Sequence, residues 1–412
     1  MKANIFPREN YLCKLRPFYK SADLIKVVTG IRRCGKSSLL LSVIAELQQQ
    51  GVAPRDIIYL NLDAYGYTSI STPEQLEKLI NASIEGEGFK YLFIDEIQNV
   101  EGFETLLNAY REEGRFSIFI TGSNSYLLSG ELVTKLTGRY IEVQVFPLSF
   151  SESCQMATFL GMRHEGSLQR RFTDYLRVGG FPRLLTIEEE AAKWTYLENL
   201  FEQIMQKDVK RRVQIRNRVV FDKVRRYFIN NFGSPISLKN VAEELKRTEK
   251  LTVKPETLKR YLNILEDARI LYKCSRFDLK SKRSLAGEGK YYLADTSLYF
   301  ATNTDQRINY GPVLENVLFL HLRSRGYEVS VGKIGNLECD FIARKAGNYF
   351  YIQVAMTIMN DQKTEDREYR ALEAIRDNYP KYLFTLDTLL QTRNGIHHLN
   401  LVDFLTGPGE LV

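Results

Sequence analysis

Short apolar runs alternate with helix-like segments over the first part of the chain. One such segment runs from residue 37 to 48 and ends before Gly51. Strands that are buried on both faces read as continuous apolar runs, as Leu92-Phe93-Ile94 does. We therefore predict an α/β fold in which helices cover both faces of a parallel sheet. Its expected strands are residues 24–29, 57–62, 91–94, 116–121 and 140–145.

The middle of the chain has a different character. It follows Gly179-Gly180-Phe181-Pro182 and is rich in helix formers and charged residues. Few helix breakers interrupt residues 187–229 before the turn residues at 230–235. We predict a helical linker over this stretch.

The region after the linker alternates helical and strand patterns. Two helix patterns are followed by two strand-like runs, which is the outline of a winged helix. A further helix and two more strands come next. In order, the segments are 238–245, 255–268, 270–277, 291–294, a helix from about Gly311, 341–343 and 349–354.

The composition is that of an ordinary soluble protein, with 44% hydrophobic and 26% charged residues. At 412 residues the chain exceeds what one core usually organises, so two or three domains are expected. The five cysteines are scattered, without C-x-x-C spacing or a zinc pattern with the four histidines, which suits a reducing cytoplasm. The first residues do not form a secretory signal, and no apolar run approaches the ~20 residues needed to span a bilayer. We predict a cytoplasmic protein without a membrane segment.

One motif carries specific chemistry. Gly30-Ile31-Arg32-Arg33-Cys34-Gly35-Lys36-Ser37 matches G-x-x-x-x-G-K-[ST] at every constrained position, between a predicted strand and a predicted helix. The glycines allow a tight turn whose N–H groups point at phosphate oxygens, beside the positive end of the following helix. Lys36 is expected to neutralise the β- and γ-phosphates, and the Ser37 hydroxyl to ligate Mg²⁺. We expect this loop, together with Ser38, to bind a nucleotide; the alternative is a chance glycine turn before a helix.

Two carboxylates end a later strand. Lys90-Tyr91-Leu92-Phe93-Ile94-Asp95-Glu96 is an apolar run that ends in acids. A strand end beside the phosphate loop is where acids can reach a metal and an attacking water. Asp95 is expected to hold Mg²⁺ through its waters, and Glu96 to accept a proton from the water or to orient it. The alternative is an ordinary solvated strand end followed by a loop. Without the phosphate loop, two acids at a strand end would be a common pattern of that kind.

These acids, with two further segments, resemble the AAA-type ATPases. The segments are Phe119-Ile120-Thr121-Gly122-Ser123-Asn124 and Leu136-Thr137-Gly138-Arg139. More narrowly, the chain is similar to a widespread prokaryotic group among them, whose C-terminal region combines a winged helix with a nuclease-like fold. The phosphate loop with Thr29, and four later segments, carry this narrower resemblance. These four are Phe146-Pro147-Leu148-Ser149-Phe150, Gly179-Gly180-Phe181-Pro182, Tyr292-Leu293-Ala294-Asp295-Thr296 and Gly311-Pro312-Val313-Leu314-Glu315-Asn316.

The resemblance implies four regions and a nucleotide. The regions are an AAA-type ATPase domain (1–186), a helical linker (187–234), a winged-helix domain (235–302) and a degenerate nuclease-like domain of the α/β restriction-endonuclease type (303–412). It implies ATP with Mg²⁺, and no N/T-K-x-D signature for guanine follows the loop. We expect ATP hydrolysis coupled to conformation or assembly. The alternative is a slow nucleotide-dependent switch or a protein-interaction module.

The resemblance also suggests roles for three more residues. Ser123 or Asn124 is similar to the residue that senses the γ-phosphate, with an ordinary polar turn as the alternative. Arg139 resembles an arginine finger acting on a neighbouring subunit's nucleotide, which implies a homo-oligomer. An ordinary surface arginine is the alternative for Arg139.

Within the phosphate loop, Arg32 and Arg33 either add positive charge or point to solvent.

Basic residues in the second half suggest a DNA or protein partner. The net charge of +7 permits nucleic-acid contact without establishing it. The basic residues of the winged-helix segment could pair with phosphates, or could be the charged face of ordinary helices. Those of the linker could follow a nucleic-acid backbone, or could be a solvated helix face. The first set is Lys254, Lys259, Arg260, Arg276, Lys280, Lys282 and Arg283; the second is Lys207, Lys210, Arg211, Arg212, Arg216, Arg218, Lys223, Arg225 and Arg226.

The last region resembles the PD-(D/E)XK nuclease layout with two changes. Asp340 fits the first acid of the pattern, and Glu315 could join it. Gln353 stands where the second acid is expected, and Ala355 where the lysine is expected. An amide adds no negative charge for a hard cation, and alanine cannot activate water. We therefore predict that nuclease chemistry is lost.

Overall fold

The computed structural model describes residues 5–123, 138–162, 166–210, 215, 217–281, 283–303, 305 and 307–412. Within these ranges the chain forms two compact units. The first unit contains the chain up to residue 146 with residues 267–269, and the second contains residues 147–266 and 270–412. The boundary therefore falls between the fifth strand and the segment that follows it, ahead of residue 186.

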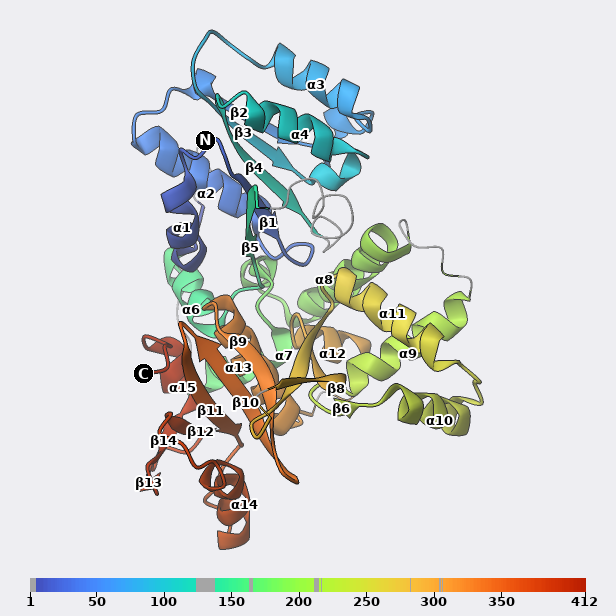
Figure 1. The fold of residues 1–412 in the computed structure, drawn as a ribbon, viewed down its shortest axis with the longest axis vertical. Helices are drawn as coiled ribbons and strands as arrows, with labels where there is room; N and C mark the ends of the chain where they lie inside the picture. The colour runs from blue at the N-terminus through green and yellow to red at the C-terminus, as the bar shows by residue number, and fades with distance from the viewer. Residues whose placement is uncertain are drawn as a thin grey trace. The chain divides into compact units, whose positions relative to one another are not determined.

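The first unit is built on a five-stranded parallel sheet of order β2-β3-β4-β1-β5 (Figure 1). All five predicted strands and the parallel sheet are confirmed. Because every pairing is parallel, the carboxyl ends of all five strands lie along one edge of the sheet. The strands are β1 (Ile25–Thr29), β2 (Ile57–Asn61), β3 (Lys90–Asp95), β4 (Phe116–Gly122) and β5 (Tyr140–Gln144).

Within the described residues, four α-helices accompany this sheet. Helices α3 (Pro73–Ala82) and α4 (Phe103–Glu112) pack on one face, where Leu76 and Leu107 join the buried side chains of the strands. Helix α2 (Lys36–Gln49) packs against β4 and contacts α1 (Glu9–Leu15). β1, β3 and β4 are buried along their whole length, which explains their continuous apolar sequences.

The second unit contains a nine-stranded mixed sheet of order β13-β14-β12-β11-β10-β9-β7-β8-β6. Strand β7 pairs in parallel with β9, so strands from the expected regions 235–302 and 303–412 form one continuous sheet. The strands are β6 (Pro235–Ile236), β7 (Leu271–Asp278), β8 (Arg283–Leu293), β9 (Glu328–Ile334), β10 (Leu337–Lys345), β11 (Asn348–Val354), β12 (Lys381–Thr385), β13 (Thr392–Arg393) and β14 (Ile396–Asn400).

Helices make up most of the rest of the second unit. Helix α6 begins at a capping box, in which Ser149 and Glu152 each bond the backbone N–H of the other. Within the expected linker, the described residues include α8, a π-helical turn at Ile204–Lys210 and α9. The helices are α6 (Phe150–Phe159), α7 (Leu168–Val178), α8 (Glu190–Gln203), α9 (Arg218–Asn230), α10 (Leu238–Glu249), α11 (Pro255–Asp267), α12 (Ser297–Thr302), α13 (Tyr310–Ser324), α14 (Gln362–Glu373) and α15 (Leu401–Thr406).

Candidate nucleotide-binding site

The loop between β1 and α2 needs glycine at both ends. Gly30 has φ +146° and Gly35 has φ +107°, a region that L side chains rarely adopt. A Cβ at Gly30 would lie 2.1 Å from the carbonyl oxygen of Val145. Since that oxygen belongs to the backbone, it cannot move aside cheaply. The loop is therefore built around the two glycines of the motif.

Helix α2 begins without a capping side chain. Its N-cap is Gly35, whereas α3 begins at a capping box formed by Thr72 and Gln75. The first-turn N–H groups of α2, which belong to Lys36, Ser37 and Ser38, have no partner within the helix. They lie at the positive end of a 14-residue helix, which is a ready site for an anion. Ser37 is half-buried and Ser38 is exposed.

Lys36 is buried beneath the loop. Its ammonium donates to the carbonyl oxygens of Gly30, at 3.0 Å, and Ile31, at 3.3 Å. It also lies 3.8 Å from the carboxylate oxygen Oε1 of Glu96. The structure thus brings the lysine of the loop and the second predicted acid together.

Asp95 and Glu96 lie at the end of β3 and share a contact with Thr121 on β4. The Thr121 hydroxyl donates to Oδ1 of Asp95 and accepts the N–H of Glu96 at 2.9 Å. The Tyr59 hydroxyl donates to Oδ2 of Asp95 at 3.3 Å. Burial of the Tyr59 hydroxyl, together with the negative charge of Asp95, raises the pKa of Tyr59. Glu96 has φ +58°, so the backbone turns sharply at the predicted base. These contacts hold both acids at the edge where the phosphate loop begins.

Two residues of this site carry no motif and were missed by sequence reasoning. The Gln98 amide donates to Oε2 of Glu96, which leaves Oε1 of that carboxylate toward Lys36. The buried Arg8 donates to the carbonyl oxygens of Cys34, at 3.0 Å, and Phe146, at 2.8 Å, and so supports the loop from behind. The contacts of Arg8 join segments that are far apart in the sequence, and the contact of Gln98 depends on the direction of its side chain. No local sequence pattern indicates either.

The remaining loop residues differ in what they face. Arg32 is buried and lies 3.5 Å from a carboxylate oxygen of Asp63, whereas Arg33 is exposed. Cys34 is fully buried with its thiol 3.4 Å from the Val145 carbonyl oxygen, and burial raises the pKa of this thiol.

One of the two candidate γ-phosphate sensors, Ser123, is fully buried directly after β4. The other sensor candidate, Asn124, lies outside the described residues.

Arg139 lies at the opposite edge of the sheet. Its carbonyl oxygen accepts the N–H of Ile25, the first residue of β1, whereas the phosphate loop follows the last residue of that strand. At about 3.3 Å per residue, the five-residue strand separates the two by roughly 17 Å. The guanidinium donates to Oδ1 of Asn108 at 3.2 Å and lies 3.7 Å from Glu112. Arg139 therefore does not face the nucleotide site of its own chain.

Comparison with known proteins agrees with the fold of the first unit. Residues 22–154 match a family model described as an AAA domain, and residues 169–307 match a domain of unknown function. An uncharacterized protein of Haemophilus influenzae is 36% identical over 411 residues, which cover 98% of this chain and all of that protein. The chain belongs to this family of AAA-domain proteins.

Two further similarities extend the comparison for this AAA-domain protein. An uncharacterized protein of Methanocaldococcus jannaschii is 31% identical over 363 residues, covering 86% of the chain and 79% of that protein. The solved structure of a Walker-type ATPase of Pyrococcus abyssi has a TM-score of 0.53 at 17% identity. That likeness covers 72% of the chain and 95% of the solved structure, and it shows a shared fold.

The AAA-domain protein carries a second group of acids on β10 and α13, beside the nine-stranded sheet of the second unit, called the C-terminal sheet below. Lys290 on β8 lies 3.0 Å from Glu315, 3.2 Å from Glu338 and 3.6 Å from Asp340. We call Lys290 with these three carboxylates the acid cluster. Burial alone would lower the pKa of Lys290, but the three carboxylates outweigh it and raise that pKa. Burial, with the charge of Glu315, raises the pKa of Asp340 to about 8.

One of the two departures from the nuclease pattern, Gln353, contacts this cluster. The Gln353 amide donates to Glu368 at 3.1 Å, and its oxygen accepts the N–H of Asp340 at 3.4 Å. Ala355 offers no polar side-chain atom. Among the described residues, no group of three or more His, Cys, Asp or Glu side chains is arranged to hold a metal ion. Where sequence reasoning expected Asp340 and Glu315 alone, the structure adds Lys290 between them.

The basic residues of the linker and wing do not form one uniform face. Arg225 is buried, with its guanidinium 4.8 Å from the centre of the Phe201 ring, and Lys223 lies 2.8 Å from Glu249. Arg276 pairs with Glu338 at 2.5 Å. The basic residues of α11 and the residue before it, Lys254, Lys259 and Arg260, are exposed.

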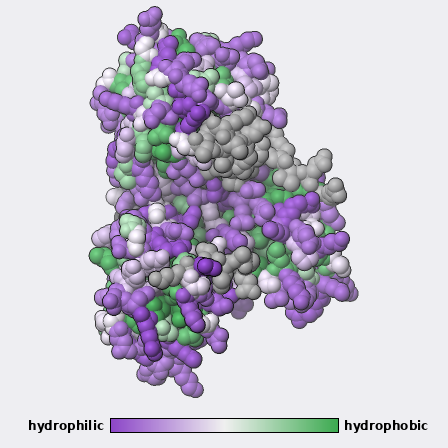
Figure 2. Space-filling model, viewed as in Figure 1, coloured by the Kyte–Doolittle hydropathy of each residue, from purple (hydrophilic) through white to green (hydrophobic). Residues whose placement is uncertain are grey.

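The described helices include none with the length and apolar character needed to cross a bilayer. Figure 2 shows hydrophilic residues over most of the visible face, with apolar residues in scattered patches.

Proposed function

We propose that this AAA-domain protein binds ATP with Mg²⁺ at Gly30–Ser37 and hydrolyses it, coupling nucleotide state to conformation or assembly. The observation that carries the proposal is the placement of Glu96 beside Lys36, 3.8 Å apart at the uncapped start of α2. A phosphate-binding loop, a buried lysine and a strand-end carboxylate are thus gathered at one edge of the sheet. In open α/β sheets, that edge is where ligands bind.

The side chains present fit the magnesium ion. Ser37 and Asp95 are hard oxygen ligands, and Mg²⁺ is commonly held by one or two protein oxygens with water and substrate phosphates. When bound, the ion would neutralise charge on the phosphates. Thr121 and Tyr59 hold the Asp95 carboxylate in place for this role.

Glu96 is the proposed general base. Its carboxylate would accept a proton from the water that attacks the γ-phosphate, or would orient that water. Lys36 would exchange its two carbonyl acceptors for phosphate oxygens, which are stronger partners because they are charged. Ser123 remains the candidate γ-phosphate sensor, together with Asn124.

Arg139 is proposed to act in trans. Its position at the far edge of the sheet favours a partner chain's nucleotide over its own. This requires a homo-oligomer, at least while ATP is bound. Light scattering with and without a non-hydrolysable ATP analogue tests it, and a monomer in both conditions would remove the role.

A slow nucleotide-dependent switch is the second candidate. It is favoured by the Lys36–Glu96 pair, because the proposed base is held by the lysine and by Gln98. In this version turnover is slow until a partner releases Glu96. We propose DNA or a protein as that partner, with the exposed Lys254, Lys259 and Arg260 as the contacting surface. Rapid turnover by the protein alone would argue against the switch.

The test is the variant Glu96→Gln. We expect kcat for Mg²⁺-dependent phosphate release to fall by roughly 10²–10⁴-fold, because the amide cannot accept the proton, while ATP binding persists. Glu87→Gln, at an exposed carboxylate, is the matched control and should hydrolyse at the parent rate. Parent-rate hydrolysis by Glu96→Gln would remove Glu96 as the base.

A further inference from the structure

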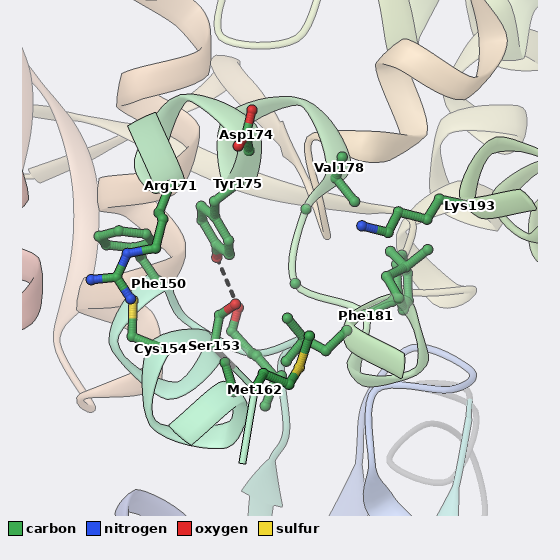
Figure 3. Close-up of a pocket in the computed structure, with 16 residues that line it drawn as sticks. Phe150, Ser153, Cys154, Met162, Arg171, Asp174, Tyr175, Val178, Phe181 and Lys193 are labelled. Carbon is green, nitrogen blue, oxygen red and sulfur yellow. Dashed lines mark hydrogen bonds between the residues drawn. The ribbon is translucent and has the colours of Figure 1, made fainter. Parts of the chain in front are cut away.

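A cavity of about 310 Å³ lies within the second unit, between α6, α7, the start of α8 and the short helix Pro182–Thr186 (Figure 3). Its walls are mostly apolar and include Phe150, Met162, Val178, Phe181 and Leu184. The volume is at the lower end of the range for small-molecule sites, which are also lined mainly by apolar side chains. It is separate from the phosphate loop, which belongs to the first unit.

Hydrogen bonds fix the wall of this cavity that Gly179 and Gly180 form. The Gly180 N–H donates to Oδ2 of Asp295 at 2.7 Å, and the Gly180 carbonyl oxygen accepts the N–H of Leu148, also at 2.7 Å. A Cβ at Gly180 would lie 2.0 Å from the Leu148 carbonyl oxygen, so only glycine fits here. Tyr175 donates its hydroxyl to the same carbonyl at 2.8 Å (Figure 3). This wall of the cavity is therefore held in place by hydrogen bonds.

Lys193 brings a positive charge to the cavity. Figure 3 shows its side chain extending from α8 with the amino group directed into the space, across from Arg171. In the part of the chain that the structure describes, the ammonium of this half-buried lysine has no ion pair or hydrogen bond. Glu190, one turn earlier on the same helix, lies 3.7 Å from Arg177 instead. With Arg171 and Asp174 as the other charged lining residues, the walls carry one net positive charge.

The donors available select the kind of anion. A phosphate group is usually held by several backbone N–H groups. Here the N–H of Gly179 already donates to the Tyr175 carbonyl oxygen at 2.8 Å, and that of Gly180 donates to Asp295. With the charge of Arg171 offset by that of Asp174, the Lys193 ammonium on an apolar wall instead matches a single carboxylate joined to an apolar body.

We propose that this cavity binds a small carboxylic acid with an apolar body, whose carboxylate pairs with Lys193. The volume suits a body the size of a phenyl ring or a short alkyl chain. The site is independent of the proposed ATPase activity, since none of its residues lies in the nucleotide site.

The test uses the full chain and three acids: hexanoate, phenylacetate and 4-phenylbutyrate, each beside its neutral primary amide. Calorimetric titration should give a Kd below about 1 mM for at least one acid, with its amide at least about tenfold weaker, as expected for loss of a charge-assisted hydrogen bond. Failure of all three acids to bind at about 10 mM would overturn the proposal. Equal binding of acid and amide would overturn it too.

Two variants locate the site. Lys193→Met should weaken the acid at least about tenfold and remove its advantage over the amide. Ala157→Phe should exclude both by filling the cavity. Lys239→Met, at an exposed lysine on α10, is the control and should bind as the parent does. Parent-like binding by Lys193→Met would place the acid elsewhere and contradict the proposal.

A final arm separates a free acid from the end of a polypeptide. A tetrapeptide with a free C-terminal phenylalanine is compared with its C-terminal amide. Binding of the free-acid peptide without binding of the small acids would overturn the small-molecule site and indicate a protein terminus instead.

Discussion

Lys36 and Lys290 are two buried lysines that lie against carboxylates, and their sites differ in how the lysine charge is balanced. At the start of α2, Lys36 has two carbonyl acceptors and one carboxylate, Glu96. In the C-terminal sheet, Lys290 has three carboxylates within 3.6 Å. The first lysine can accept a further anion, and the helix N-terminus beside it favours one. The second lysine is already surrounded by negative charge.

This difference shows why similar residue types do not imply similar chemistry. A lysine among acids is part of many catalytic sites, but its use depends on which charge is left unbalanced. Lys36 can exchange its weak carbonyl partners for phosphate. Lys290 is the cation that the Glu315, Glu338 and Asp340 side chains share. The predictions below use matched substitutions to test this contrast, from the largest expected effect to the smallest.

The largest effect is expected for Lys290→Met. Removing the lysine leaves the Glu315 and Glu338 carboxylates, beside the buried Asp340, without their shared cation, so the free energy of unfolding should fall by about 3–5 kcal/mol. Denaturant titration of the full chain measures this. Lys273→Met, at an exposed lysine on the neighbouring strand β7, should change stability little. A loss below about 1 kcal/mol for Lys290→Met would mean that the acid cluster does not depend on Lys290.

Lys36→Met should cost little stability and much ATP affinity, in contrast to Lys290→Met. Its partners are mainly neutral carbonyls, so stability should fall by no more than about 1–2 kcal/mol. Affinity for Mg²⁺–ATP should fall by about 100-fold, the equivalent of about 3 kcal/mol for the lost charged contacts. Fluorescent-nucleotide titration, with Lys20→Met as an exposed control, separates the two effects. Unchanged affinity would contradict the assigned role of Lys36.

A smaller effect, and one that depends on pH, is expected for Asp340→Asn. The pKa of Asp340 is raised to about 8 in the folded chain, against an ordinary value of 3.8, so between about pH 4 and 8 the folded chain keeps a proton that the unfolded chain has lost. This contribution to stability is full below pH 4 and is lost as pH rises toward 8.

The asparagine variant does not titrate at this position. Its stability relative to the parent should therefore rise by roughly 1 kcal/mol per pH unit between pH 5 and 7. Unfolding measured in one buffer series at constant ionic strength tests the slope. Parallel profiles for the two proteins would show that Asp340 is ionised throughout this range.

The smallest effect is expected for Gln98→Ala. The amide positions Glu96 without contacting the nucleotide, so kcat should fall by about tenfold, the equivalent of losing one hydrogen bond to a charged group. ATP affinity should not change. A rise in kcat would instead show that Gln98 restrains the base, as the switch model requires.

Sequence reasoning was most successful where local pattern decides the structure. In the first unit, β1, β3 and β4 are mainly apolar runs because they are buried along their whole length. The phosphate loop is a contiguous motif, and its glycine conformations follow from the turn it makes. The order of two helices and two strands in the second half was also visible, although β8 (Arg283–Leu293) is longer than its apolar run.

Contacts between distant segments were not predictable in this way. Strands β9, β12 and β14 carried no prediction, and nothing local indicates that β7 pairs with β9. Lys290 lies 50 residues before Asp340, in a stretch with no motif, yet it decides the charge of the acid cluster. Arg8, Gln98 and Thr121 act through side-chain direction, which composition and spacing do not encode.

The most direct test of the central claim is a structure of the Glu96→Gln variant with Mg²⁺ and ATP. We expect the β- and γ-phosphates to contact the first-turn N–H groups of α2 and the Lys36 ammonium, with the metal between Ser37 and Asp95. A nucleotide bound elsewhere, or a Lys36 still bonded to Gly30 and Ile31 in the complex, would contradict it.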